Sequence, residues 1–170
     1  MKLLLENWRK YTNETEVGKI KKVPTFDPCF GGKEKVFEPL LGKTLEIIEM
    51  TINKNIDDWP QKIECMTEEE IEGGEKKGGG HGLYIGEEHR LKINSNMDPF
   101  NIYLNFIHEN FHHAKPELIG SKYSTQDRHI EINKSLMRQV VEHILSYINQ
   151  EDKIKEQIPK DFIVSLREYE

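Results

Sequence analysis

The sequence predicts a single α+β domain in which one helix and a small sheet of about three strands pack against two further helices. Three observations support this prediction. Apolar residues recur every three or four positions in three separate segments, as in amphipathic helices. Three short runs with β character lie between the first and second of these segments. Hydrophobic residues make up 36% of the 170 residues, which is enough for a modest core.

Residues 1–35 are expected to form an N-terminal tail, and residues 36–170 the folded domain. The tail is rich in charges, proline and glycine and has little apolar periodicity after its first residues. Its opening segment, MKLLLENWRKYTNETE, has apolar side chains near helical spacing. Such a short amphipathic helix needs a partner to be stable.

The first part of the domain is expected to contain one helix and three strands. Apolar residues at helical spacing predict a helix from Phe37 to about Asn55. Residues 62–67 predict a strand, and residues 83–85 and 90–94 predict a hairpin. The acidic run and the glycine-rich stretch at 68–82 are expected to form an exposed loop.

The second part of the domain is expected to be helical. Asp98 followed by Pro99 is typical of a helix start, and Pro116 predicts the end of that helix. A second helix with a long apolar face is expected to begin at Ser124. A last short helix is predicted over residues 161–170.

The first of these helices contains the sequence His108-Glu109-Asn110-Phe111-His112, an HExxH motif. The four-residue step places both imidazoles on one face of the helix, one turn apart, where they can bind the same zinc ion. Glu109 is then placed to take a proton from a metal-bound water. The alternative is that both histidines are ordinary polar residues of a helix.

A catalytic zinc ion needs a third protein ligand and an open position for water. Asp127, His129 and Glu131 are candidates, because they lie within five residues at the start of the next helix. We favour His129, while Asp127 and Glu131 remain possible. Tyr123, just before this segment, is a candidate donor to the oxyanion that forms during hydrolysis.

The other histidines are expected to lie outside the zinc site. His113 is about 100° round the helix from His112, so we expect it on the solvent side or in a supporting role. His81 and His89 are expected at the surface, although His81 could close a structural zinc site as a fourth ligand. His143 lies within the long later helix.

The segments "HRLKIN … YLNFIHENFHHAKPEL" resemble the small zincin metallopeptidases over about residues 83–145. The downstream sequence "DRHIEINKSLMRQV" is similar to the SprT-like arrangement, in which a histidine at the start of a helix is the third ligand. This resemblance implies a minimal zincin-like fold, a Zn²⁺ cofactor and His129 as the third ligand. The ImmA-like group, which uses an acidic third ligand, would instead imply Glu131.

The function expected from these features is zinc-dependent hydrolysis of a protein or peptide substrate, with Glu109 as general base. The strand at Arg90 to Asn94 is expected to lie at the sheet edge and to bind the substrate backbone by β-augmentation. The rival hypothesis is a non-catalytic metal-binding protein, or a phage-associated structural or interaction protein, with a zincin-like fold.

The N-terminal segment also resembles the capsid-targeting peptides of internal proteins in large tailed phages. That resemblance implies a cleavable targeting segment, processed after Glu14 or Glu16, and packaging in a virion. Composition alone predicts instead a tail whose short helix frays at its ends.

Composition excludes several other classes of protein. The net charge of −6, without a long basic stripe, argues against sequence-independent nucleic-acid binding. No apolar run is long enough for a secretory signal or a membrane span. Cys29 and Cys65 fit neither a zinc-binding spacing nor a disulfide scaffold, so we expect free thiols in a reducing compartment such as the cytoplasm. The sequence leaves the oligomeric state open.

Overall fold

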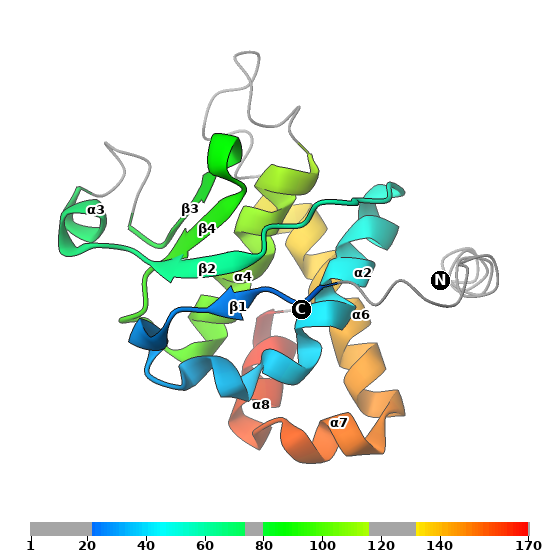
Figure 1. Ribbon diagram of the computed structural model, residues 1–170. Helices are drawn as coiled ribbons and strands as arrows, with labels where there is room; N and C mark the ends of the chain where they lie inside the picture. Colours follow the sequence, from blue (N-terminus) through cyan, green and yellow to red (C-terminus); the bar gives the residue numbers. More distant parts are fainter. Residues whose placement is uncertain (1–21, 74–79, 116–131, 170) are drawn as a thin grey trace.

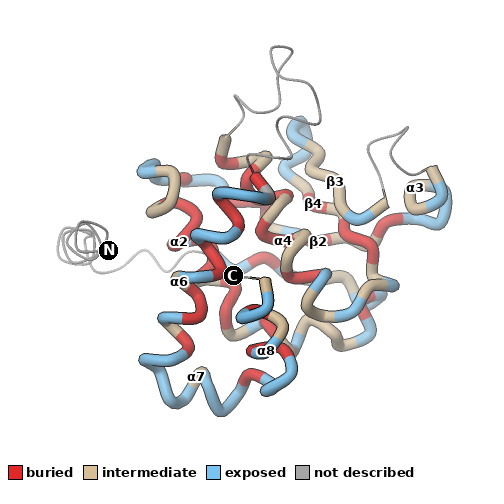
Figure 2. Tube along the Cα trace, turned by 180° about the vertical axis from the view of Figure 1, so that it is seen from behind, coloured by how far each residue is buried: buried red, intermediate tan, exposed pale blue. Residues whose placement is uncertain are grey.

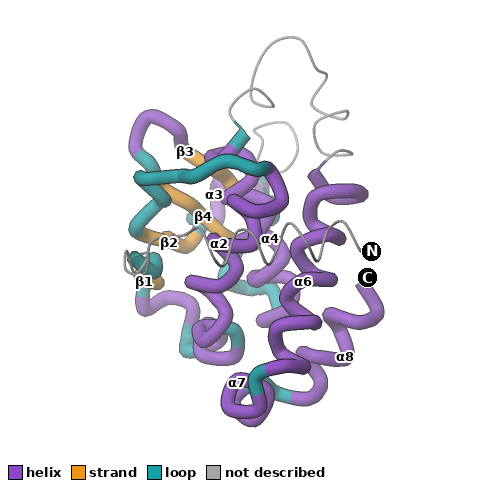
Figure 3. The backbone as a smooth tube through the Cα atoms, turned by 90° about the vertical axis from the view of Figure 1, so that its right-hand side faces the viewer, coloured by secondary structure: helices purple, strands orange, loops and turns teal. Residues whose placement is uncertain are grey.

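The computed structural model describes residues 22–73, 80–115 and 132–169, which form an α+β fold. A sheet lies on one side of the molecule and a layer of helices covers one of its faces (Figures 1 and 3). The longer helices of this layer are α2 (Leu41–Ile52), α4 (Pro99–Ala114), α6 (Met137–Gln150) and α8 (Lys160–Tyr169). The expectation of an α+β class is therefore confirmed.

The sheet has four described strands in the order β1-β2-β4-β3. β1 (Thr25–Phe26), β2 (Lys62–Cys65) and β4 (Arg90–Ile93) are parallel, and β3 (Gly82–Ile85) pairs antiparallel with β4. The hairpin predicted from the sequence is confirmed. The prediction that Arg90 to Asn94 forms the sheet edge is wrong, because β4 has β2 on one side and β3 on the other. At this side of the sheet the outermost described strand is β3.

The two faces of the sheet have opposite character. Ile63, Leu91 and Ile93 are fully buried against the helices. The alternate residues carry charges on the other face, where the Arg90 guanidinium donates two hydrogen bonds to Glu64 at 3.2 and 3.0 Å. This alternation is typical of a sheet with one buried and one solvated face. Buried functional side chains are therefore expected on the side of the sheet that the helices cover.

Helix α4 occupies the centre of the helix layer and begins as the sequence predicts. The Asp98 carboxylate accepts hydrogen bonds from the backbone amides of Phe100 and Asn101, and Pro99 occupies the first helical position. Tyr103 is fully buried and shares a 2.8 Å hydrogen bond with Thr44 of α2. Buried residues concentrate on the inner sides of α2, α4 and α6 (Figure 2).

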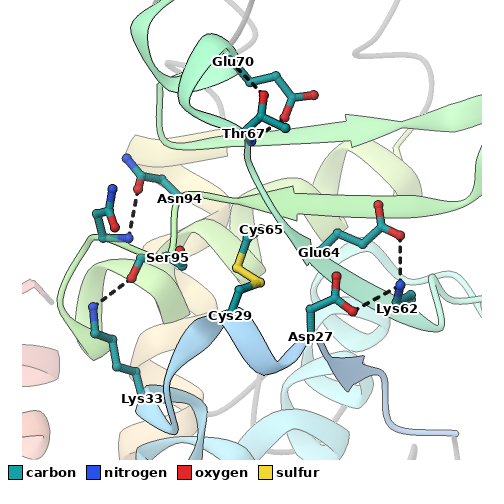
Figure 4. Close-up of a disulfide and its surroundings, with 11 residues drawn as sticks. Asp27, Cys29, Lys33, Lys62, Glu64, Cys65, Thr67, Glu70, Asn94 and Ser95 are labelled. Atoms are coloured by element: carbon teal, nitrogen blue, oxygen red, sulfur yellow. Dashed lines mark hydrogen bonds and ion pairs between the residues drawn. A yellow bond between two sulfur atoms is a disulfide. The ribbon is translucent and has the colours of Figure 1, made fainter.

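The described part of the expected N-terminal tail, residues 22–35, is attached to the folded domain. β1 pairs with β2, and the Phe30 side chain is buried in the hydrophobic core. Cys29 and Cys65 form a disulfide, so the expectation of two free thiols is wrong (Figure 4). The Lys33 ammonium donates to the carbonyl oxygens of Ser95 and Met97, at 2.7 and 3.1 Å. A two-residue strand and short 3₁₀ turns produce no periodicity, which is why the sequence pattern does not indicate them.

Two helices were not expected. The acidic run forms α3 (Glu68–Glu72), whose start is stabilised by a capping box between Thr67 and Glu70. α7 (Asp152–Gln157) connects α6 to α8. The final helix, predicted over residues 161–170, is confirmed as α8. No helix of the described residues combines the length and apolar character needed to cross a membrane.

Several expectations lie outside the described residues. They include the helix start at Ser124, the cleavage positions Glu14 and Glu16, and the amphipathic opening segment. The described part of the later helix begins with a π-helical turn, Ile132–Leu136, and continues as α6.

Candidate metal centre

His108 and His112 converge on one point beside α4. Their Nε2 atoms are 3.0 Å apart, and the ring centroids are 4.7 Å apart. Two imidazole nitrogens that bind one zinc ion at roughly 2.0–2.1 Å lie about 3.3 Å from each other in a tetrahedral site. The separation and the chemistry of the two donors therefore fit a zinc ion, as the four-residue spacing predicts.

The remaining predicted ligands are not placed by the structure. Asp127, His129 and Glu131 lie outside the described residues, as does Tyr123. Among residues 22–73, 80–115 and 132–169, no three His, Cys, Asp or Glu side chains are grouped to hold a metal ion. The His81 Nδ1 atom lies 3.3 Å from the sulfur of Met97 instead.

Glu109 is the most unusual group of the site, because its charged-type side chain is buried while the two histidines of the motif remain partly accessible. Only 4% of the residue is exposed. Burial raises its pKa to about 8, against the opposing effect of a hydrogen bond from the backbone amide of Tyr84. In the absence of a nearby positive charge, the buried carboxyl is therefore largely protonated at neutral pH.

Gly82 of β3 allows this close approach of strand and helix. A Cβ atom at position 82 would lie 2.6 Å from Oε1 of Glu109 and 3.0 Å from its Cγ. Real Cβ atoms essentially never come so close to another heavy atom, so any larger residue at this position would have to displace the carboxyl.

The register of the hairpin places Glu109 at the outer side of β3. The Asn94 amide donates to the His81 carbonyl at 2.9 Å. Because hydrogen-bonded pairs alternate in an antiparallel ladder, Leu83 and Ile85 turn their backbone groups toward β4, whereas Gly82 and Tyr84 turn theirs away from it. The amide of Tyr84 therefore points away from β4, and its hydrogen bond to Glu109 places the carboxyl on this outer side of β3.

The His113 side chain is largely buried, so of the two expected positions the solvent-side one is wrong and the supporting one remains. Its side chain is 7% exposed, and its Nδ1 atom is hydrogen-bonded to the Tyr84 hydroxyl at 2.7 Å. The ring also contacts Trp59, with 5.6 Å between centroids, and its Nε2 atom lies 3.8 Å from Asp58. Burial lowers the pKa of His113, which favours the neutral ring.

The other two histidines do not join the pair. His89 is half-exposed and lies near Asp58 and His113 at the surface. His143 is on α6, where burial lowers its pKa.

Sequence reasoning missed the contribution of β3 to the site. Gly82 and Tyr84 both face α4, and neither belongs to a recognisable motif. The sequence does indicate that Glu109 and His113 share a helix face, because they are four residues apart. Which strand that face meets depends on the sheet order, which the sequence alone does not determine.

No family model matches the chain, and no curated protein or solved structure matches it significantly.

Proposed function

We propose that this protein is a zinc-dependent peptidase whose active site is centred on α4. The observation that carries the proposal is the pair of Nε2 atoms 3.0 Å apart, on a helix that also carries the buried Glu109, one residue after His108 and three before His112. Zinc, when bound, would polarise the substrate carbonyl and make water more acidic. We further propose His129 as the third ligand, with Asp127 and Glu131 as the alternatives.

In this proposal Glu109 takes the proton of the attacking water. Its carboxyl accepts a hydrogen bond from the Tyr84 amide and lies close to Gly82, both of β3. Its ionised form is favoured beside a divalent cation, because the positive charge offsets the loss of solvation. Tyr123 remains the proposed donor to the developing oxyanion.

The substrate backbone would bind along β3 rather than along β4. The Gly82 amide and the carbonyl oxygens of Gly82 and Tyr84 point away from β4, at the outermost of the described strands. We propose that an extended peptide pairs with them as a further strand. Such a peptide would pass directly beside Glu109. Main-chain pairing of this kind would tolerate many side chains, with specificity supplied by adjacent pockets.

The test compares the wild type with Glu109→Gln, both loaded with zinc. Denatured casein is the probe, and new peptide termini are detected by mass spectrometry. We expect Glu109→Gln to keep its zinc and to lose cleavage by at least about a hundredfold, the usual contribution of a general base. Cleavage at the wild-type rate by this variant would contradict the assignment of Glu109. A wild type that binds zinc but cleaves nothing would favour the non-catalytic alternative.

A further inference from the structure

Tyr84 contacts two residues of α4 through two different groups. Its backbone amide donates to the Glu109 carboxyl, and its hydroxyl is hydrogen-bonded to His113 Nδ1 at 2.7 Å. Glu109 and His113 are four residues apart, so they lie on one face of α4 at successive turns. A single residue of β3 is thus bonded to two turns of the helix that carries the motif.

The His113 ring is itself held from its other side. Trp59, which is 4% exposed, lies against the ring. The indole Nε1 of Trp59 donates to Oε1 of the buried Glu49 at 3.2 Å, and the Ile56 amide donates to the same oxygen at 2.8 Å. The segment from Ile56 to Trp59 is therefore anchored on α2, and it fixes the ring to which Tyr84 is bonded.

The turn after β3 also lies beside the Tyr84 ring. A Cβ atom at Gly86 would lie 3.4 Å from Cε1 of Tyr84, so the backbone of this turn passes close to the ring. The tyrosine ring therefore lies between this turn and His113 of α4.

We infer that Tyr84 is a positioning residue for Glu109. The bond between its hydroxyl and His113 fixes β3 along α4, and this keeps the Tyr84 amide on the carboxyl of Glu109. The inference rests on the proposed function for its catalytic meaning, because Glu109 is the proposed base. The contact itself can be tested without any substrate.

The test is Tyr84→Phe, which removes the hydroxyl and keeps the ring. Exchange of the backbone amide hydrogen at position 84 is measured by NMR on the zinc-loaded wild type and variant. We expect exchange at position 84 to become about tenfold faster, which corresponds to the loss of one typical hydrogen bond. The zinc content should not change.

Tyr103→Phe is the matched control. It removes the hydroxyl of another tyrosine, which is bonded to Thr44 on the side of α4 that faces α2. It should reduce global stability without a selective change at position 84. Equal acceleration in both variants, or none in Tyr84→Phe, would overturn the inference.

A second pair of variants tests the partner of the hydroxyl. His113→Asn keeps a polar group close to the position of Nδ1, and His113→Leu removes it. We expect slow exchange at Tyr84 to be largely retained in the first variant and lost in the second; the same exchange rate in both would overturn the inference.

With casein as substrate, Tyr84→Phe should lower kcat more than it raises KM. A selective exchange effect in a protein that cleaves nothing would contradict the proposed function and leave the contact established. An active enzyme whose kcat is unchanged in Tyr84→Phe would overturn the positioning role alone.

Discussion

The disulfide between Cys29 and Cys65 is expected to supply a large part of the stability of this domain. The two residues are separated by 36 positions. In the chain-entropy model, releasing a loop of this length gives the unfolded chain about 13 cal/mol/K of entropy, or about 4 kcal/mol at 25 °C. Native domains are commonly stable by only about 5–15 kcal/mol, so removal of the bond should bring the protein close to unfolding.

The perturbation is the double variant Cys29→Ala/Cys65→Ala, because alanine avoids placing a hydroxyl in the partly buried position of Cys65. Urea unfolding is followed by circular dichroism, with and without a thiol reductant. We expect the reductant to lower the free energy of unfolding of the wild type by roughly 3–4 kcal/mol. The double variant should match the reduced wild type and should not respond to the reductant.

The reasoning would be refuted if the reductant left the urea midpoint of the wild type unchanged. It would also be refuted if alkylation of the unreduced, unfolded protein labelled both cysteines. Either result would mean that only non-covalent contacts attach residues 22–35 to the domain, chiefly the pairing of β1 with β2 and the burial of Phe30.

Two further predictions concern α4 and its contact with β3. Gly82→Ala should displace the Glu109 carboxyl and destabilise the protein by about 1–3 kcal/mol, as overpacking does. Gly86→Ala should cost less in the same urea assay, because its Cβ atom would meet the Tyr84 ring at an ordinary contact distance of 3.4 Å. Asp98→Ala should cost about 1 kcal/mol at pH 7 through the loss of the helix cap. Burial alone would raise the pKa of Asp98, but hydrogen bonds from Asn101 and Phe100 hold it below its usual value, so this stabilisation is present above about pH 4 and disappears as the pH falls through the lowered pKa. Asp98→Asn should retain much of the cap and lose its pH dependence; equal stability of wild type and Asp98→Ala at pH 7 would contradict the assignment of the cap.

The elements that the sequence predicts correctly have a strong periodic or capping signal of their own. α4 has Asp98 and Pro99 at its start and apolar residues along one face. β2, β3 and β4 appear as short β-like runs at or near their observed bounds. β1 escapes the sequence pattern because two residues, Thr25 and Phe26, carry no alternation that could be detected.

The order of the strands explains the other differences. Nothing within Arg90 to Asn94 indicates that β2, nearly thirty residues earlier in the chain, will pair with β4 and displace it from the edge. The pairing of Cys29 with Cys65 depends on the same arrangement, because it needs β2 beside the turn that follows β1. Both are long-range consequences of packing rather than of local preference.

The same distinction between local and long-range signals applies to the candidate site. His108, Glu109 and His112 are contiguous in the motif, and the geometry of one helix brings the two imidazoles together. Gly82 and Tyr84 join them only through the register of β3 on β4 and the packing of that hairpin on α4. The sequence therefore predicts the motif residues of the candidate site. The residues of β3 that contact them can be identified only from the tertiary structure.

The zinc content of the chain, measured by elemental analysis on protein without a histidine tag, tests the central claim most directly. We predict about one zinc ion per wild-type chain, lost in His112→Ala and retained in His143→Ala, a control that removes an imidazole from α6 instead. Loss in His129→Ala as well would assign the third ligand, and retention there would move it to Asp127 or Glu131. A wild-type chain that contains no zinc, even after reconstitution with zinc salt, would contradict the metal site and with it the proposed peptidase.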